Sequence, residues 1–322
     1  MVFLVRALRS PFDGSVQAGD PSFRVTGSSQ LVASMPVPLI INFTPTGAVP
    51  TREMNPHVPL SVAELVEDVR RACELGITLV HLHARDEAGR PTLDPEIYGA
   101  MIRQIRSFAP ELVICVSLTG RDDPDPENRV APLRLEGDAM PDMGSLTLGS
   151  LNFPGQASCN PPNLIHRLAT QMRERRILPE LEIFDLGMAN FARYLARKGV
   201  LAGPHYANVI LGNIGSAQLD ASHLGLLLRD LPENTTWALG GIGRFQLPAN
   251  LLGLALDGGV RVGLEDNLYW EMADRTPATN LALLERIHAL ARHAGRPVMS
   301  SADFRARLGL APGRGRYGLA DQ

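Results

Sequence analysis

The chain has 322 residues, 45% of them hydrophobic, which is enough to form a large buried core. Its 31 basic and 34 acidic residues give a formal charge of −3, so no strongly basic surface is expected and the sequence argues against a nucleic-acid partner. No apolar run approaches the roughly 20 residues that cross a bilayer, so we expect no membrane partner either.

The N-terminal segment differs in composition from the rest of the chain. Residues 1–36 begin with an apolar run that Arg6 interrupts and continue with Ser- and Gly-rich sequence, so we expect a disordered appendage there. A single catalytic domain is expected over residues 37–322. The three cysteines, Cys73, Cys115 and Cys159, are odd in number and far apart, which favours reduced thiols in a cytoplasmic protein.

Short runs rich in apolar and β-branched residues alternate with longer amphipathic segments. The predicted strands are residues 38–44, 78–84, 112–119, 144–153, 179–185, 207–212, 235–243 and 260–267. The predicted helices are residues 61–76, 94–109, 161–176, 188–199, 220–231, 248–259 and 280–295. Ser61 and Glu64 form a capping box at the start of the first helix, and Gly76 supplies its end. Residues 121–142 are rich in proline and acid, which indicates a loop.

Eight strands joined by crossover segments predict a (β/α)₈ barrel, a fold of about 250 residues. The alternative is a doubly wound open sheet. That fold would be favoured by a glycine-rich phosphate loop directly after the first strand. The sequence there, TPTGAVPT, lacks the required glycine spacing, so the barrel is the better prediction.

His81 and His83 lie two residues apart near the end of the second predicted strand. Side chains at that spacing point to the same side of a strand, and the carboxyl ends of barrel strands form the active-site mouth. Two imidazoles on one face form half of a site for a divalent metal, and a catalytic zinc commonly adds a carboxylate. Glu265, at the end of the eighth strand, is the candidate for this third ligand, because the eighth strand closes the ring near the first two.

Five motifs follow one another along the chain: HLHARDEAGRP, VSLTG, GSLNF, WALGGIGR and VRVGLEDN. Together they resemble the β-keto acid cleavage enzyme family, best known from the 3-keto-5-aminohexanoate cleavage enzyme, and the similarity runs from Pro38 to Leu310. The resemblance implies a (β/α)₈ barrel that binds zinc through His81, His83 and Glu265. It also implies a homotetramer and a reaction that converts a β-keto acid and acetyl-CoA into acetoacetate and a new acyl-CoA.

The resemblance also assigns roles to other residues. Asp266 resembles the family's catalytic base and Arg261 resembles the partner that keeps this base ionised. Strict strand alternation would turn Asp266 away from Arg261, so Asp266 can act only if the strand ends before it. Ser117, Gly120 and Ser145 resemble positions that bind the substrate's carboxylate or carbonyl group.

The chain departs from the family pattern at Val49. The member that acts on 3-keto-5-aminohexanoate carries a glutamate there, which pairs with the substrate's amine. A valine cannot compensate a buried ammonium, so the sequence predicts an uncharged acyl tail. Arg244, after the seventh strand, is a candidate for contact with the phosphates of CoA, and we expect Glu182 to lie near the site.

Two other functions are alternatives to this enzyme. A metal-dependent lyase or aldolase that acts on a sugar acid without CoA would use the same three ligands, and release of a CoA ester from acetyl-CoA would distinguish the two enzymes. A barrel that binds a metabolite without catalysis would not need the ligand set. The presence of His81, His83 and Glu265 argues against it.

Overall fold

The apolar runs of the sequence form a closed parallel barrel in the computed structural model, which describes residues 36–321. The predicted appendage, apart from Pro36, lies outside the described residues. Around the barrel the strands are β1 (Ile41–Phe43), β12 (Gly259–Val262), β11 (Thr235–Gly241), β10 (His205–Leu211), β9 (Leu178–Ile183), β6 (Met143–Thr147), β5 (Val113–Val116) and β2 (Leu79–Leu82). The prediction of a (β/α)₈ barrel is confirmed.

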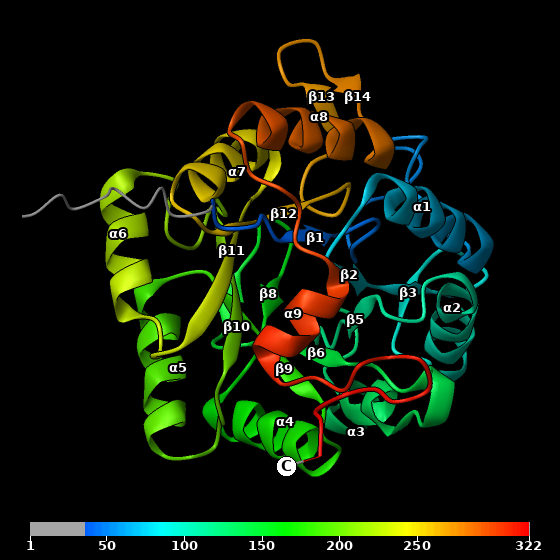
Figure 1. The fold of residues 1–322 in the computed structure, drawn as a ribbon, viewed down its shortest axis with the longest axis vertical. Coiled ribbons are helices and arrows are strands. Elements are labelled where there is room, and N and C mark those ends of the chain that lie inside the picture. The colour runs from blue at the N-terminus through cyan, green and yellow to red at the C-terminus, as the bar shows by residue number, and fades with distance from the viewer. Residues whose placement is uncertain (1–35, 322) are drawn as a thin grey trace, which may run out of the picture. The chain divides into compact units, whose positions relative to one another are not determined.

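Helices surround this barrel (Figure 1). They are α1 (Val62–Leu75), α2 (Pro95–Phe108), α4 (Pro162–Glu174), α5 (Leu186–Arg197), α6 (Ala221–Asp230), α7 (Gln246–Ala255) and α8 (Asn280–His293). Both halves of the capping box between Ser61 and Glu64 are formed, as the sequence predicts. The predicted loop over residues 121–142 contains one short helix, α3 (Pro126–Val130), and two 3₁₀ turns, η1 (Ala131–Arg134) and η2 (Gly137–Ala139).

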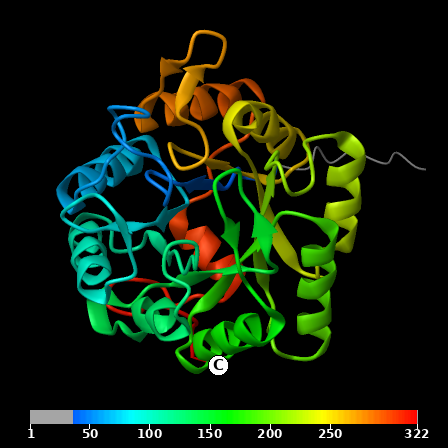
Figure 2. The same ribbon diagram turned by 180° about the vertical axis from the view of Figure 1, so that it is seen from behind.

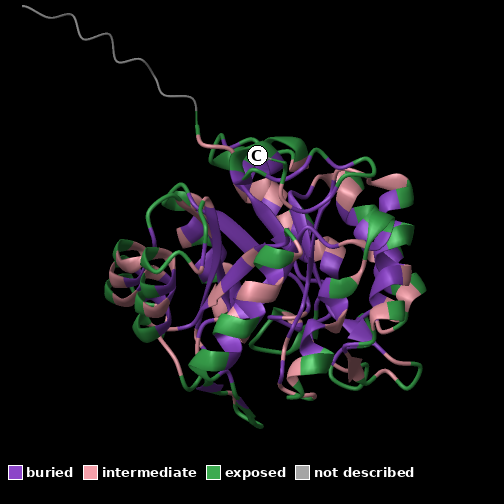
Figure 3. Cartoon of the chain, turned by 90° about the horizontal axis from the view of Figure 1, so that it is seen from below, coloured by how far each residue is buried: buried purple, intermediate pink, exposed green. Residues whose placement is uncertain are grey.

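The strands are buried on both faces, as parallel strands inside a ring of helices must be (Figure 3). In β2, Val80 and Leu82 point outward into the main apolar core, whereas His81 points into the barrel. No helix within residues 36–321 combines the length and apolar character that crossing a bilayer requires.

A further helix that the sequence did not predict, α9 (Ser301–Leu308), closes one end of the barrel. Phe304 and Leu308 pack against the first residues of several strands, including Leu79 and Met143, so α9 covers the amino ends of the strands (red in Figure 1). Figure 2 shows the barrel from the opposite side, where the loops after the strands gather. The end that remains for a site is therefore the carboxyl end.

The barrel strands end earlier than predicted. Strand β12 ends at Val262, where Gly263 adopts a φ of 155°, and β5 ends at Val116. The single strand predicted over residues 144–153 is instead β6 followed by a small hairpin of β7 (Leu151–Asn152) and β8 (Ala157–Ser158). Two more hairpins, β3 (Ala84–Arg85) with β4 (Pro91–Thr92) and β13 (Tyr269–Glu271) with β14 (Thr276–Pro277), also lie outside the barrel sheet.

Candidate active site

His81 and His83 extend from the carboxyl end of β2 into the barrel. His81 is the third residue of this strand and His83 follows its last residue, so one residue separates the two. Both residues are buried, and their Nε2 atoms lie 3.2 Å apart. The two imidazoles therefore face a common point.

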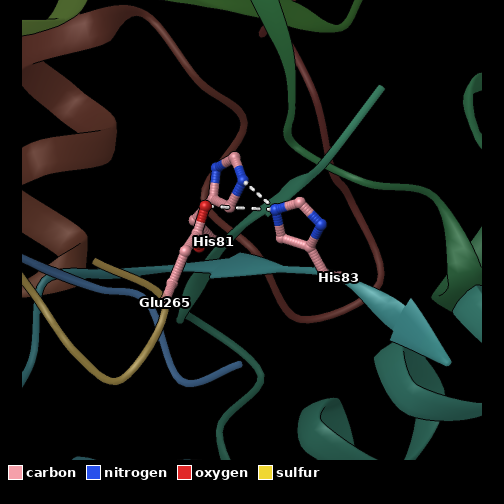
Figure 4. Close-up of side chains that lie close together, drawn as sticks. All are labelled: His81, His83 and Glu265. Carbon is pink, nitrogen blue, oxygen red and sulfur yellow. Dashed lines mark hydrogen bonds and ion pairs between the residues drawn. The ribbon is translucent and has the colours of Figure 1, made fainter. Parts of the chain in front are cut away.

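Glu265 reaches the same point from the loop after β12. Its Oε1 lies 3.2 Å from Nε2 of His83, and the ligand atoms of the three residues all lie within 4.8 Å of one another. Figure 4 shows the three side chains converging from two segments that are far apart in the sequence. Closure of the ring brings them together, because β1 pairs with β12 on one side and with β2 on the other.

A buried carboxylate orients His81. Glu180 on β9 lies 2.5 Å from Nδ1 of His81 and also accepts hydrogen bonds from Asn42 (2.8 Å) and from the thiol of Cys115 (3.1 Å). With Nδ1 donating to Glu180, Nε2 is the atom that faces His83. Burial opposes a charge on His81, but Glu180 and Glu265 outweigh it and raise the pKa of His81 to about 9. The two carboxylates thus favour a positive charge here.

The donor set suits a divalent metal. Two imidazole nitrogens and a carboxylate are the ligands of many catalytic zinc sites, which keep one position open for substrate. Within residues 36–321, the buried Oε2 of Glu265 has no hydrogen-bond partner, and a metal ligand bond would satisfy it. A second group, His81, Cys115 and Glu180, also lies within ligand distance. Its members already bond to one another through Glu180, so it supports His81 instead of forming a separate site.

Arg261 and Asp266 form an ion pair beside these three side chains. Nε of Arg261 donates to Oδ2 of Asp266 at 2.9 Å, and Nη2 donates to Oε1 of Glu265 at 2.6 Å. The early end of β12 removes the conflict with strand alternation, because the turn at Gly263 brings Asp266 to the side of Arg261. Burial raises the pKa of Asp266 to about 6, with Glu265 acting in the same direction and Arg261 against it. A buried carboxylate with a raised pKa is suited to accept a proton.

A cavity of about 700 Å³ opens at the carboxyl ends of the strands. The predicted site residues that line it are Val49, His83, Ser117, Arg261, Glu265 and Asp266. Much of the remaining wall is apolar and includes Leu151, Phe184, Ile210 and Leu268. Polar groups at one place in an otherwise apolar cavity are typical of a site for a small organic substrate.

Both glutamates of β9 belong to this region. Glu182 lines the cavity and accepts a hydrogen bond from Oγ1 of Thr147 at 2.6 Å, and burial raises its pKa. Glu180 lies below it against His81. The sequence analysis favoured only Glu182. Strand alternation predicts that both side chains point into the barrel, but it does not predict which residues each of them contacts.

Four predicted residues do not line the cavity: His81, which is buried inside the barrel, and Ser145, Gly120 and Arg244. The hydroxyl of Ser145 accepts a hydrogen bond from the backbone N–H of Leu118 at 3.0 Å. A side chain at Gly120 would collide with Arg129, whose Nη1 lies 2.6 Å from the position of a Cβ, so this glycine makes room for a buried arginine. Arg244 is exposed in a 3₁₀ turn, η3 (Gly243–Phe245), and stays outside the cavity wall.

Sequence reasoning missed Arg121, Thr147 and Asn213, which also line the cavity. Each follows or ends a barrel strand, and that position was the only signal available for them. It is a weak signal, because many loop residues after a strand point to solvent.

The chain is similar to characterised proteins along most of its length. Residues 38–310 match the model of a family described as beta-keto acid cleavage enzyme. A 3-oxoadipate:acetyl-CoA acetyltransferase from Cupriavidus necator is 38% identical over 279 residues, which are 86% of this chain and 96% of that protein. A 3-keto-5-aminohexanoate cleavage enzyme from Acetoanaerobium sticklandii is 33% identical over 275 residues, 85% of this chain and 98% of the relative.

Solved structures show the same fold. The binary complex of ObcA with oxaloacetate superposes with a TM-score of 0.70 at 20% sequence identity and covers 80% of this chain and 68% of that one. At this identity the match supports the barrel and carries no statement about the site.

Proposed function

Because this chain belongs to the β-keto acid cleavage enzyme family, we propose that it transfers the acyl group of a β-keto acid to CoA, with acetyl-CoA as the second substrate. In this reaction the bond between C2 and C3 of the β-keto acid breaks. The C2 carbon and its carboxylate become bonded to the acetyl group and leave as acetoacetate, while the released acyl group forms the thioester with CoA. The observation that carries the proposal is the cluster of His81, His83 and Glu265 beside the ion pair of Arg261 and Asp266.

We propose zinc as the metal that His81, His83 and Glu265 bind. The set of two imidazoles and one carboxylate with an adjoining cavity supports this choice. When bound, the ion would act as a Lewis acid that stabilises negative charge on the keto oxygen of the substrate.

Asp266 is the proposed base. Its carboxylate removes a proton from the CH₂ group between the two carbonyl carbons of the β-keto acid, and it can return this proton to C2 when the bond between C2 and C3 breaks. Arg261 holds Asp266 in place through the hydrogen bond from Nε and supplies positive charge next to it. Ser117, at the cavity wall, is the proposed donor to a substrate oxygen.

The test is a set of β-keto acids offered to the purified protein together with acetyl-CoA, with acetoacetate and the new acyl-CoA both measured. Stoichiometric formation of the two products is expected. A lyase or aldolase that needs no CoA would consume substrate without acetyl-CoA, and this outcome would replace the proposal by that alternative. The cytoplasmic location and the tetramer expected above stay predictions.

Val49 supports an acyl tail without positive charge. It lines the cavity, with 51% of its surface exposed, and because it is a valine this position offers no carboxylate to an ammonium group. Valine permits the uncharged tail predicted from the sequence, and it equally permits an anionic tail. The 38% identical relative is named for 3-oxoadipate, whose tail ends in a second carboxylate.

Val49→Glu is expected to shift the substrate preference toward a cationic tail. The new carboxylate can form a charge-assisted hydrogen bond, which raises kcat/KM for 3-keto-5-aminohexanoate relative to 3-oxohexanoate by about 10-fold. Val49→Gln, which has a similar size and no charge, is the control. If the unaltered protein already prefers the amino substrate, the inference from Val49 is wrong.

Glu180→Gln is expected to weaken metal binding by about 10- to 100-fold, the usual effect of losing the carboxylate that supports a histidine ligand. The substitution keeps the volume and removes the charge that fixes His81 through Nδ1. Competition with a chromophoric chelator measures the affinity without any need for turnover. Glu87→Gln, the same change at an exposed position, is the matched control and should leave the metal affinity unchanged. Unchanged affinity in a folded Glu180→Gln protein would show that Glu180 does not position the ligand.

A further inference from the structure

Among residues 36–321, one cationic side chain at the cavity lacks a carboxylate partner. Arg261, which also lines the cavity, is paired with Asp266 and Glu265. Arg85 does not line the cavity and donates to backbone carbonyl oxygens of the neighbouring loops. Arg121 also lines the cavity, yet within residues 36–321 no carboxylate lies at ion-pair distance from it. Its Nε is buried and has no hydrogen-bond partner among the same residues. Burying part of a guanidinium whose N–H donors have no acceptor costs free energy, unless a ligand supplies the acceptor.

Neighbouring acids do not provide this partner. Asp122, the next residue, is exposed and accepts a hydrogen bond from Gln156. Glu182 is bonded to Thr147 and Glu265 to Arg261 and His83. The carboxylates of the site are therefore committed to other groups.

Arg121 stacks on an aromatic side chain. Its guanidinium carbon lies 3.7 Å from the ring centroid of Phe153, and Phe153 packs edge to face against Phe184 at 5.8 Å. All three residues line the cavity. Stacking uses the face of the guanidinium and leaves the N–H donors in its plane, which is the geometry that matches the two oxygens of a carboxylate.

The position of Arg121 relative to the candidate metal ligands indicates which part of a substrate it would meet. Ser117 directly follows β5, whereas Arg121 lies further along the same loop and stacks on the residue that follows β7. The candidate metal ligands lie at the strand ends. If the reacting carbons of a β-keto acid lie at these ligands, its tail would extend toward the loops that carry Arg121 and Phe153.

We propose that Arg121 binds a carboxylate at the far end of the substrate's tail, so that the preferred substrates are 3-oxo dicarboxylic acids. This inference rests on the proposed function and narrows its substrate class. The phosphates of CoA are a less suitable partner, because the pantetheine arm separates them from the thioester, whereas Arg121 lines the same cavity as Glu182 and Glu265. Val49 agrees with the proposal, since it adds no negative charge to the cavity wall.

The test compares 3-oxoadipate with 3-oxohexanoate, which has the same chain length and ends in a methyl group. The unaltered protein should have the higher kcat/KM for 3-oxoadipate. In Arg121→Gln the ratio of the two kcat/KM values should fall about 10- to 100-fold, the effect of losing a hydrogen-bonded charge partner. Arg121→Lys keeps the charge and loses the planar fork, so it should keep a preference for the diacid that is smaller than that of the unaltered protein.

Calorimetric titration of 3-oxoadipate in the absence of acetyl-CoA gives a second measure that needs no turnover. Binding should weaken in Arg121→Gln by the same factor as the kcat/KM ratio. An equal loss for both acids would mean that Arg121 binds the reacting carboxylate, and a higher KM for acetyl-CoA with both acids would mean that it binds a CoA phosphate. Either result overturns the proposal, as does a preference of the unaltered protein for 3-oxohexanoate. Absence of acetoacetate with every acid would instead contradict the proposed function, and the titration would still test Arg121.

Discussion

His81→Ala is expected to remove both the bound metal and turnover. The imidazole of His81 is one of three donors that face a common point, and its other nitrogen is held by Glu180. Loss of a residue that only supports a ligand usually weakens metal binding by about 10- to 100-fold, and loss of the ligand itself should weaken it more. Metal content after dialysis and acetoacetate formation measure the two effects, and both should fall to background.

His81→Ala leaves the buried Glu180 without its partner, at a cost of about 3–5 kcal/mol in the free energy of unfolding. A second site variant and a control keep the prediction testable if this protein folds poorly. Glu265→Gln keeps the side-chain volume and leaves Arg261 paired with Asp266, so it should lose metal in a folded protein. His166→Ala, at an exposed position of α4, is the matched control. Retention of one metal ion per chain in either site variant would show that the proposed ligand set is wrong.

Asp266→Asn is expected to keep the metal and lower kcat by about 10²- to 10⁴-fold, the usual contribution of a positioned general base. An amide can still accept the hydrogen bond from Arg261 but cannot take the substrate's proton. Arg261 also remains paired with Glu265, so the change leaves no isolated buried charge. Single-turnover formation of acetoacetate, together with metal content, measures the result.

The matched control is Asp138→Asn, the same chemical change at an exposed aspartate in η2, just before β6. It should leave kcat and the metal content unaltered. Loss of metal in Asp266→Asn would identify Asp266 as a ligand. A kcat within about threefold of the unaltered protein would assign the proton transfer to another group, and Glu182, a carboxylate at the cavity wall, would then be the next candidate.

The sequence predicts the barrel well because each strand carries its own apolar signal. The predicted helices over residues 61–76 and 94–109 agree with α1 and α2 to within one residue at each end, since their caps are local. The position of His81 and His83 on one side of a strand follows from alternation alone. Their approach to Glu265 follows from ring closure, which the number of strands predicts.

Other features depend on contacts that are remote in sequence. The helix α9 has few apolar residues and little periodicity, and its role depends on Phe304 and Leu308 meeting the first residues of the strands. The ion pair of Arg261 and Asp266 depends on where β12 ends, which no local pattern in VRVGLEDN reveals. That Arg121 has no carboxylate partner within residues 36–321 could not be recognised without knowing which groups the neighbouring carboxylates already bind.

The turn at Gly263 has a consequence for how the chain tolerates mutation. A methyl group there would lie 2.0 Å from the carbonyl oxygen of Thr44, so even alanine would push the following loop outward. In a selection for activity, Gly263 would tolerate substitution as poorly as His81 and His83, although it has no side chain that could contact a substrate. Its intolerance would come from backbone shape alone, since the absence of one carbon atom allows Glu265 and Asp266 to face inward together.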